Sequence, residues 1–331
     1  MKECRVKDIC IKGSSNLKQK DVEGKKGLYP VYGASGIISS IDTYHQENEY
    51  IAIVKDGSGI GRVSFMPPKS SVIGTMQYIL PKEGYDIRYI GYCLQSLGLN
   101  KYKQGAAIPH IYFRDYGERN IVVSENINEQ RRIVSYLDSS FKLIDEIKNK
   151  ALKSLTEAKA LFQSALAEAM EPKEGTVMER IGDVFTTYAG GTPLKSQKDY
   201  YEGGEIPWLR SGEVCKKYIS ETELYITQKG MDNSSAKFYP ENTVVVAMYG
   251  ATAAQVGILK IKATSNQAVC GIIPHKDFIP EYVYYWFLFV QDDLASQAQG
   301  GAQPNISQIK IKNVLIPIIN KEEQKRIVSH L

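Results

Sequence analysis

A nine-residue segment occurs twice in this chain, as EQRRIVSYL at residues 129–137 and as EQKRIVSHL at residues 323–331. The two copies are 194 positions apart, which is far longer than the repeat unit of a solenoid or a propeller. A repeat of this period indicates two copies of one domain-sized module. The length of 331 residues agrees, because each half is long enough to bury its own core.

Shorter motifs outside this segment recur in the same order and at nearly the same spacing. Residues 89–92 (YIGY) correspond to residues 282–285 (YVYY) at a shift of 193. Residues 105–111 (GAAIPHI) correspond to residues 300–306 (GGAQPNI) at a shift of 195. The order is kept although the side chains are only weakly similar. This pattern is expected when two copies keep a scaffold and diverge in the surface that contacts a ligand.

Each module is predicted to combine strands with a helix. The apolar runs at residues 50–54 and 243–247 are rich in β-branched residues and are followed by glycine clusters, which is typical of strands that end in turns. Residues 89–95 and 281–291 carry aromatic and apolar residues at closer spacing, which favours one helix in each copy. The sequence therefore predicts an α+β fold.

A long helix is predicted between the modules. Residues 129–170 contain no Gly and no Pro and are rich in Glu, Lys, Ala and Leu. At 1.5 Å per residue this helix would be about 60 Å long. Apolar residues recur along it in alternating steps of four and three, interrupted by two serines, which is typical of a coiled-coil seam. The seam residues are Ile133, Leu137, Ile144, Ile147, Ala151, Ala158, Leu161 and Ala165.

These observations predict four segments. The first module occupies residues 1–128, a coiled-coil spacer helix follows at 129–171, and the second module occupies 172–322. Residues 323–331 then begin a second helix that is truncated after about two turns. Our hypothesis is that the chain is cut at its repeat. Because a seam needs a partner, the first helix could then pair with another chain.

Composition excludes several classes of protein. Hydrophobic residues at 43% and charged residues at 24% are ordinary for a folded globular protein. No apolar run approaches the roughly 20 residues that cross a bilayer, and the first residues do not form a signal peptide. Five cysteines without a C-x-x-C pair indicate reduced thiols. We therefore expect a cytoplasmic protein without a membrane partner.

Catalytic and metal-binding motifs are not found in the sequence. It has no Walker phosphate loop, no H-E-x-x-H and no G-x-S-x-G, and its four histidines are not at ligand spacing. Residues 57–61 (GSGIG) are similar to a dinucleotide-binding loop, but the next residues favour a strand where that loop needs a helix. We predict a hairpin there and a matching turn at residues 250–255. No catalytic residue and no metal site are therefore assigned.

Polar and basic side chains gather in the predicted turns of both modules. Lys and Arg suit phosphates, while Arg, Asn and Gln can bond base edges bidentately. The net charge of +4 permits a nucleic-acid partner without requiring one. The candidate DNA contacts in the first module are Lys55, Arg62, Lys103, Gln104, His110 and Arg114, and those in the second are Arg210, Gln255, Asn266, Gln267, Gln303, Asn305 and Lys310.

One pair of candidates stands at the same place in the two modules. His110 follows Pro109, and Asn305 follows Pro304 at the matching position. A polar side chain that is fixed after a proline at a turn could read a base edge, and an ordinary turn residue would give the same pattern.

Several short motifs together resemble the specificity subunit, or S subunit, of type I restriction-modification systems. The resemblance covers essentially the whole chain. Each motif alone is weak, and the combination is specific. The motifs are GGTP at 190–193, GGEIPWL at 203–209, QPNI at 303–306, LIP at 315–317 and the two E-Q-[RK]-R-I-V repeats.

This resemblance implies two repeated α/β target recognition domains, each of which reads one half of a split double-stranded DNA site. Two conserved helices would separate the domains and dock two methyltransferase subunits, and a restriction subunit would join the complex. The S subunit itself would have no catalytic site and no cofactor. S-adenosylmethionine, ATP and Mg would belong to the partner subunits. A spacer of about 60 Å would limit the separation of the half-sites to below about 18 base pairs.

A second hypothesis comes from a different class of function. The chain could be a truncated interaction module that sequesters methyltransferase subunits without productive DNA recognition. Salt dependence separates the two, because DNA binding through phosphates weakens steeply with salt while apolar helix docking does not.

Overall fold

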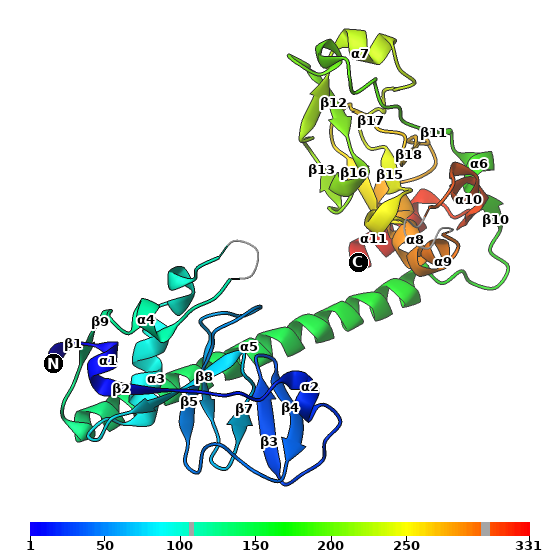
Figure 1. The fold of residues 1–331 in the computed structure, drawn as a ribbon. Coiled ribbons are helices and arrows are strands. Elements are labelled where there is room, and N and C mark those ends of the chain that lie inside the picture. Colours follow the sequence, from blue (N-terminus) through cyan, green and yellow to red (C-terminus); the bar gives the residue numbers. More distant parts are fainter. Residues whose placement is uncertain (106–108, 299–304) are drawn as a thin grey trace. The chain divides into compact units, whose positions relative to one another are not determined.

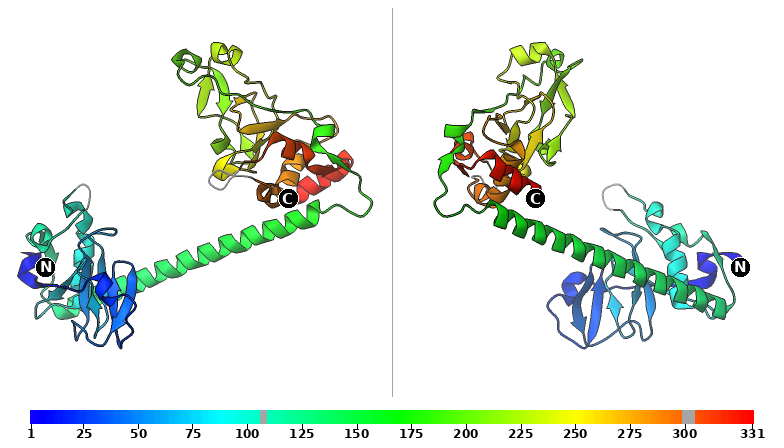
Figure 2. Two further views of the ribbon diagram at one scale, coloured as in Figure 1. Left: turned by 45° about the vertical axis from the view of Figure 1, so that its right-hand side comes forward. Right: turned by 180° about the vertical axis from the view of Figure 1, so that it is seen from behind.

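The computed structural model describes residues 1–105, 109–298 and 305–331, and the chain divides into two compact units, Met1–Ala151 and Leu152–Leu331 (Figure 1). Helix α5 (Ile127–Met170) has 44 residues and contributes to both units. Figure 2 shows it as one continuous helix. The predicted mixed fold, with a long helix between two repeated domains, is therefore confirmed. The helix begins two residues before the predicted start, because the Asn126 side chain accepts a hydrogen bond from the Asn128 N–H at 2.9 Å and caps it.

The first unit is built around a four-stranded antiparallel sheet. Its strand order is β2 (Cys10–Ser14), β8 (Met76–Pro81), β5 (Tyr50–Val54), β6 (Val63–Met66). Helix α3 (Ile87–Ser96) packs across strands β5, β6 and β8. All five residues of β5 are buried, so both faces of this sheet are covered. The predicted strand at 50–54 and the predicted helix at 89–95 are both confirmed.

A smaller sheet lies beside it in the same unit. Strand β3 (Tyr29–Gly33) pairs with β4 (Gly36–Ile41) in antiparallel fashion and with β7 (Ser71–Val72) in parallel. A two-stranded ribbon of β1 (Lys2–Arg5) and β9 (Asn120–Val123) brings the first strand next to the start of α5.

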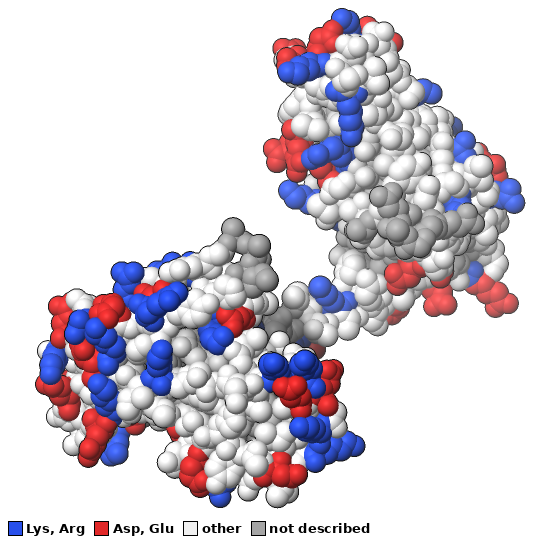
Figure 3. Space-filling view, viewed as in Figure 1, with Lys and Arg blue, Asp and Glu red and all other residues white. Residues whose placement is uncertain are grey.

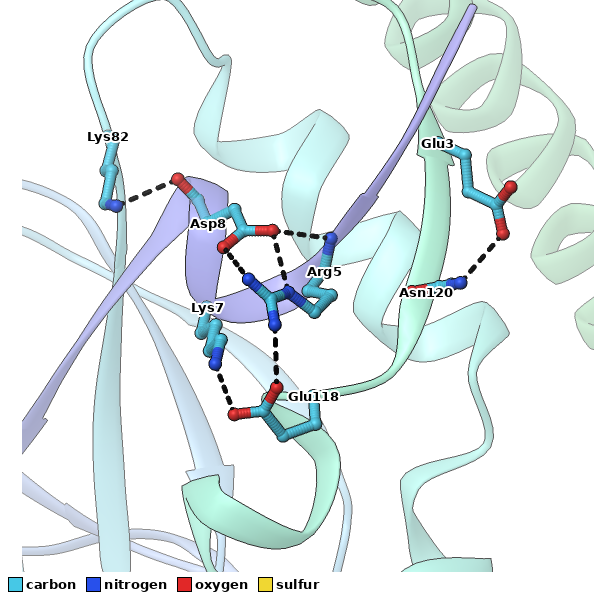
Figure 4. Close-up of polar contacts among 7 residues, drawn as sticks. All are labelled: Glu3, Arg5, Lys7, Asp8, Lys82, Glu118 and Asn120. Atoms are coloured by element: carbon cyan, nitrogen blue, oxygen red, sulfur yellow. Dashed lines mark hydrogen bonds and ion pairs between the residues drawn. The ribbon is translucent and has the colours of Figure 1, made fainter.

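Charged side chains hold the beginning of the chain to the segment before β9 (Figure 4). The Arg5 guanidinium donates to Asp8 Oδ2 at 3.1 Å and to Glu118 Oε2 at 3.3 Å, and Lys7 donates to the other oxygen of Glu118 at 2.5 Å. These groups are solvent-exposed, so water and salt screen the pairs and each contributes little to stability. The network orients helix α1 (Val6–Ile9) more than it stabilises the unit.

The second unit repeats this plan with one more strand. Its larger sheet has the order β11 (Thr187–Ala189), β18 (Val269–Ile272), β15 (Val244–Ala247), β16 (Val256–Leu259), β13 (Tyr218–Ile219). Its smaller sheet has the order β14 (Leu224–Ile226), β12 (Ile206–Leu209), β17 (Thr264–Ser265), and its ribbon pairs β10 (Met178–Arg180) with β19 (Leu315–Pro317). Helix α8 (Pro280–Phe289) packs on β15 and β16 as α3 does on β5 and β6. The strand and helix predicted for this module are confirmed, although the helix ends at Phe289 and not at 291.

Short helices complete both units. The α-helices are α2 (Gln19–Val22), α4 (Phe113–Tyr116), α6 (Ile181–Val184), α7 (Gln228–Asp232), α9 (Gln291–Ser296), α10 (Gln308–Asn313) and α11 (Lys321–His330), and the 3-10 helices are η1 (Leu99–Tyr102), η2 (Lys198–Tyr200), η3 (Ser211–Glu213) and η4 (Gly250–Thr252). None of the described helices is both long enough and apolar enough to cross a bilayer.

The glutamine of the repeated nine-residue segment has a structural role in the first unit. Gln130 is fully buried at the start of α5. Its Oε1 accepts from the Asp86 N–H at 2.7 Å, and its Nε2 donates to the Ser124 carbonyl at 2.8 Å and to the Gly84 carbonyl at 3.2 Å. One side chain therefore satisfies three backbone groups that would otherwise be buried without partners.

Gln324 does the same in the second unit, near the start of α11. It is also fully buried, and its Oε1 accepts from the Ile279 N–H at 2.8 Å. Its Nε2 donates to the carbonyls of Asp277 and Ile319, both at 2.9 Å. These are the positions that correspond to the partners of Gln130 in the repeat. The need to join the helix to the loop before α3 or α8 gives a physical reason for the repeated E-Q pair.

The predicted seam of α5 divides into buried ends and an exposed middle. At the first end Ile133 packs against the core of the first unit. At the other end Leu166 and Met170, which were not among the predicted seam residues, are buried in the core of the second unit. Between them Ile144, Ile147 and Leu161 are 57%, 58% and 72% exposed. Of the other seam residues, Leu137 and Ala165 are half-buried, and Ala151 and Ala158 are exposed.

Candidate nucleic-acid interface

The turn that follows β5, residues 55–62 and here called the β5 turn, is fixed by backbone hydrogen bonds. The Lys55 N–H donates to the Thr75 carbonyl at 2.9 Å, and the Lys55 carbonyl accepts from the Ile111 N–H at 2.9 Å. Val54 and Gly61 close the hairpin, since the Gly61 N–H donates to the Val54 carbonyl at 2.8 Å. Strands β5 and β6 on either side are antiparallel, which confirms the predicted hairpin.

The β15 turn of the second unit, residues 248–255, has the same backbone bonds at the matching positions. The Met248 N–H donates to the Ala268 carbonyl and the Met248 carbonyl accepts from the Ile306 N–H, both at 2.8 Å. The Ala254 N–H donates to the Ala247 carbonyl at 2.9 Å. These three bonds correspond one by one to those of the β5 turn. The turn predicted at 250–255 is therefore confirmed, and the two turns are copies of one backbone frame.

The glycines of the β5 turn serve its backbone conformation. Gly61 has a φ of 79°, and a Cβ atom there would lie 2.5 Å from the backbone nitrogen of Asn100. Ala254, which takes its place in the second unit, has a φ of 67°. Both residues therefore adopt the left-handed region, which a non-glycine residue enters at a cost of about 1–2 kcal/mol. The glycine cluster shapes a hairpin and does not precede a helix.

Side chains on the β5 turn form an ordered polar cluster. His110 forms an isolated antiparallel bridge with Gln104, with both backbone bonds at 2.8 Å. The His110 Nδ1 lies 2.6 Å from Asp56 Oδ1, and the other oxygen of Asp56 accepts from Lys55. On its other side the imidazole is stacked with the Tyr112 ring, at 6.1 Å between centroids and 18° between planes. The structure thus brings together Lys55, Gln104 and His110, and adds Asp56 and Tyr112, which the sequence analysis missed.

The charge state of Asp56 decides how this cluster is protonated. Burial raises the pKa of Asp56, but the hydrogen bonds from Lys55 and from His110 outweigh it and hold the pKa below the ordinary value. Asp56 is therefore a carboxylate at neutral pH and can only accept hydrogen bonds. Nδ1 of His110 must then carry the proton in this contact.

The remaining candidates of the first unit lie around this cluster. Arg114 places its guanidinium 4.8 Å from the centre of the Tyr112 ring, and its side chain is 75% exposed. Gln104 Nε2 donates to Asp115 Oδ1 at 2.9 Å. Arg62 Nη1 donates to the Ala34 carbonyl at 2.8 Å, which ties the β5 turn to the turn between β3 and β4. Lys103 is exposed.

The β15 turn carries neutral side chains where the β5 turn carries Lys55 and Asp56. Met248 and Tyr249 stand in their place; Met248 is buried in the core of the unit, and Tyr249 is 40% exposed. Asn305 is exposed and bridges Tyr249 as His110 bridges Asp56. Gln255 is exposed at the position that matches Arg62.

Other candidates of the second unit are engaged in contacts within the protein. The Asn266 side chain accepts from the Ala268 N–H at 3.2 Å, and Gln267 accepts from Thr192. Arg210 is paired with Glu213 and Glu223.

Two further candidates lie near the end of this unit. Lys310, in α10, donates to the Gln297 carbonyl. Gln303 lies outside the described residues.

The GGTP and GGEIPWL motifs join the two sheets of the second unit. A Cβ atom on Gly190 would lie 2.2 Å from the Ser265 carbonyl oxygen, and one on Gly191 would lie 2.3 Å from the Ala236 nitrogen. The Trp208 Nε1–H donates to the Gly191 carbonyl at 3.0 Å. These motif residues therefore have a packing role next to Thr192 and not a direct role on the exposed surface.

In the view of Figure 3, neither unit shows a large surface patch of a single charge. On that face Lys and Arg are mixed with Asp and Glu over both units. Among the described residues there is no group of three His, Cys, Asp or Glu side chains that could hold a metal ion. The chemistry of the two turns is therefore that of hydrogen-bond donors, acceptors and aromatic faces, which are the groups that read nucleic-acid bases.

The family model and the individual proteins that are similar to this chain point to the same family. A family model described as Type I restriction modification DNA specificity domain matches residues 1–157 and 173–331. The specificity subunit of the type I restriction enzyme EcoR124I/EcoR124II from Escherichia coli is 26% identical over 257 residues, which are 74% of this chain and 62% of that protein. The MjaIX specificity subunit from Methanocaldococcus jannaschii is 32% identical over 165 residues, which are 48% of this chain and 38% of that protein. The matches therefore span less than two thirds of either relative.

Solved structures share the fold. A chain from a structure of a type I R-M system has a TM-score of 0.73 at 16% identity, covering 99% of this chain and 88% of that chain. The HsdS subunit from Thermoanaerobacter tengcongensis has a TM-score of 0.56 at 16% identity, covering 99% of this chain and 87% of that chain. At this identity the likeness concerns the fold alone.

Proposed function

The chain belongs to the type I restriction-modification DNA specificity family, and on this basis we propose that each of its two units reads one half of a bipartite DNA site. The family match confirms the prediction of a specificity subunit in place of an enzyme. The matched frames of the β5 and β15 turns carry the two-reader proposal. They keep one set of backbone bonds and differ in their exposed side chains, as two readers of different half-sites would.

We also propose that the partners of this chain include methyltransferase subunits and, through them, a restriction subunit. The support is the exposed middle of α5, where Ile144, Ile147 and Leu161 present apolar side chains that a partner helix would cover. Another copy of the chain is a second partner for the same residues. S-adenosylmethionine, ATP and Mg would be held by the partner subunits, and the assembly would act on DNA in the cytoplasm.

Methylome sequencing tests the proposal. Cells that express this chain with its methyltransferase partner should acquire a methylated motif made of two specific halves separated by unspecified bases. Cells that express the methyltransferase alone serve as the control. Exchange of residues 1–128 for those of a relative should change one half of the motif and leave the other. Methylation at an undivided site would contradict the two-reader proposal.

Salt dependence distinguishes the proposal from the alternative of a module that only sequesters methyltransferase subunits, which the family match does not favour. Binding of specific duplex DNA should weaken by orders of magnitude between about 50 and 200 mM salt if several phosphates are contacted. Binding of the methyltransferase subunit through apolar residues should change little over the same range. A complex that binds methyltransferase but has no salt-sensitive DNA affinity would support the alternative.

A further inference from the structure

The imidazole of His110 is immobilised by its surroundings. Backbone bonds on both sides hold the residue, because the His110 N–H and carbonyl pair with Gln104 at 2.8 Å and the next N–H, that of Ile111, donates to the Lys55 carbonyl at 2.9 Å. Asp56 and the Tyr112 ring then hold the side chain. A side chain that is already ordered loses little conformational entropy when it contacts a ligand.

The contact with Asp56 also determines which ring nitrogen remains available. The Asp56 carboxylate accepts from Lys55 with one oxygen and from His110 Nδ1 with the other, at 2.6 Å. In a neutral imidazole with Nδ1 protonated, Nε2 carries a lone pair and acts as an acceptor. No partner for Nε2 is found among the residues that the structure describes, and the His110 side chain is 38% exposed.

We propose that His110 reads one base of the first half-site through Nε2, and that Asp56 is the positioning residue that makes Nε2 an acceptor. This inference rests on the proposed DNA-recognition function and names the chemistry of one contact in it. An acceptor requires a base edge that offers an amino group, which in the major groove is N4 of cytosine or N6 of adenine. Guanine and thymine offer O6, N7 or O4 in that groove, all of which are acceptors and would face the lone pair of Nε2.

The second unit contains an internal control for this contact. Asn305 occupies the position of His110 and is held by the same frame, with a bridge to Tyr249 in place of Asp56. Its amide can donate and accept at every pH, so it has no tautomer that a neighbour must fix. Substitution of Asp56 should therefore affect base preference in the first half-site and leave the position read by Asn305 unchanged.

A proton on Nε2 in place of Nδ1 would convert Nε2 into a donor. The Asp56 carboxylate, which also accepts from Lys55, opposes this tautomer because it accepts from Nδ1. With Nε2 as a donor, the preferred edge at this position becomes that of guanine or thymine. The preference for an amino-bearing base should therefore depend on Asp56.

Selection from a randomised duplex library tests the proposal. The full chain in complex with its methyltransferase subunits is incubated with the library, and the bound DNA is sequenced. The wild-type complex should enrich a bipartite motif in which one position of the first half-site prefers cytosine or adenine by about tenfold. In H110A the preference at that single position should disappear, while the second half-site remains. In N305A the loss should fall in the second half-site instead.

Two conservative variants separate base reading from a role in folding. H110N carries the residue that the second unit has at this place, so it should keep the melting temperature and the rest of the half-site, and lose the restriction to an amino-bearing base. D56N allows either ring nitrogen to carry the proton, so it should admit guanine or thymine at the same position.

Several results would overturn the inference. An unchanged motif in H110A, or a wild-type preference for guanine or thymine, would remove His110 as the reader while the proposed function stands. Loss of the whole half-site in H110N at an unchanged melting temperature would assign His110 to the frame of the turn. A wild-type complex that enriches no sequence would overturn the proposed function itself, and this inference with it.

Discussion

The β5 turn of the first unit and the β15 turn of the second share a backbone and differ in their exposed chemistry. Both continue a buried central strand and both receive the segment that follows a proline, through hydrogen bonds at matching positions. The first turn carries a polar cluster of Lys55, Asp56 and His110, and the second exposes Tyr249 and Asn305 while its Met248 is buried. A rigid frame therefore leaves the exposed positions free to change without a change of fold.

The largest effect is expected from the buried glutamines, which the two units share. Gln130→Ala and Gln324→Ala should each lower the free energy of unfolding of their own unit by about 3 kcal/mol, because three buried backbone groups lose their partner. Both tryptophans, Trp208 and Trp286, belong to the second unit. Urea titrations followed by tryptophan fluorescence should therefore show the shift for Gln324→Ala, while circular dichroism shows it for both variants.

The matched control is Gln163→Ala, which removes an exposed glutamine from the C-terminal part of α5 and should leave both transitions within about 0.5 kcal/mol. A large effect of Gln324→Ala together with a negligible effect of Gln130→Ala would break the equivalence of the two units. The repeated E-Q pair would then need a separate explanation in each.

The two turns should respond in opposite directions to exchanges at their left-handed residue. Gly61→Ala should destabilise the first unit by about 2–3 kcal/mol, because the new methyl group meets the Asn100 backbone at 2.5 Å and the left-handed conformation disfavours alanine. Ala254→Gly should be neutral or stabilise the second unit by up to about 1 kcal/mol, since strain is relieved while one buried methyl group is lost. Thermal unfolding of the two variants measures both changes.

An exchange at a glycine without close neighbours serves as the control for this pair. Gly212→Ala has open space around it and no positive φ, so a change beyond about 0.5 kcal/mol is not expected there. If Gly61→Ala were as harmless as Gly212→Ala, the β5 turn would not be the tight frame that the comparison requires.

The features that depend on local sequence were predictable, and those that depend on distant partners were not. Helix α5 was predicted because 42 successive residues lack Gly and Pro, and the hairpin after β5 because its glycines precede residues that favour a strand. Asp56 was missed because its partner His110 lies 54 positions away and nothing in the sequence joins them. A usable signal existed, since Asp56 aligns with Tyr249 inside a turn that is otherwise matched.

The buried glutamines, and the candidate DNA contacts that are paired within the protein, show the same limit of prediction from sequence. The E-Q pair was visible as a repeat, but its hydrogen bonds to residues before α3 and α8 follow only from the folded chain. Arg210 was chosen for its basic side chain, and the structure pairs it with Glu213 and Glu223. Residue type alone cannot show whether a charged group is already paired within the protein.

A smaller difference between the units is expected at the junction of α3 with α5. Arg88 donates to Asp138 at 2.7 Å, and Tyr92 donates to the same carboxylate. Burial raises the pKa of Asp138, but the bonds from Tyr92 and Arg88 outweigh it and lower the pKa. A lowered pKa stabilises the folded unit above the unfolded value of about 4, and the contribution is lost as the pH falls through the folded value. For groups this exposed the contribution is only about 0.5 kcal/mol.

Asp138→Asn should therefore reduce the pH dependence of the unfolding of the first unit between about pH 5 and pH 2, without affecting the tryptophan transition of the second unit. Asp145→Asn removes a carboxylate from the same stretch of α5 and is the control for the change of net charge. Equal effects of the two substitutions would show that net charge, and not the contact with Arg88, sets the dependence.

Substitutions in the exposed middle of α5 are expected to have the smallest effect on stability. Their effect on assembly with partner subunits should be large. Ile144→Glu and Ile147→Glu should change the free energy of unfolding by less than about 0.5 kcal/mol, because both side chains are more than half exposed in the chain alone. Val134→Glu, at the buried end of the helix, should destabilise the first unit by several kcal/mol. The same helix would thus tolerate a charge in its middle and not at its end.

Binding of methyltransferase subunits should follow the reverse order. Burial of one isoleucine is worth about 1.5–3 kcal/mol, so Ile144→Glu and Ile147→Glu should each weaken binding at least tenfold. Lys150→Glu, an exposed polar position on the same stretch of helix, controls for the added negative charge. Isothermal titration with the purified subunit measures the difference. If the isoleucine variants bound as tightly as Lys150→Glu, the exposed stripe would not be the docking surface, and α5 would act only as the connection between two readers.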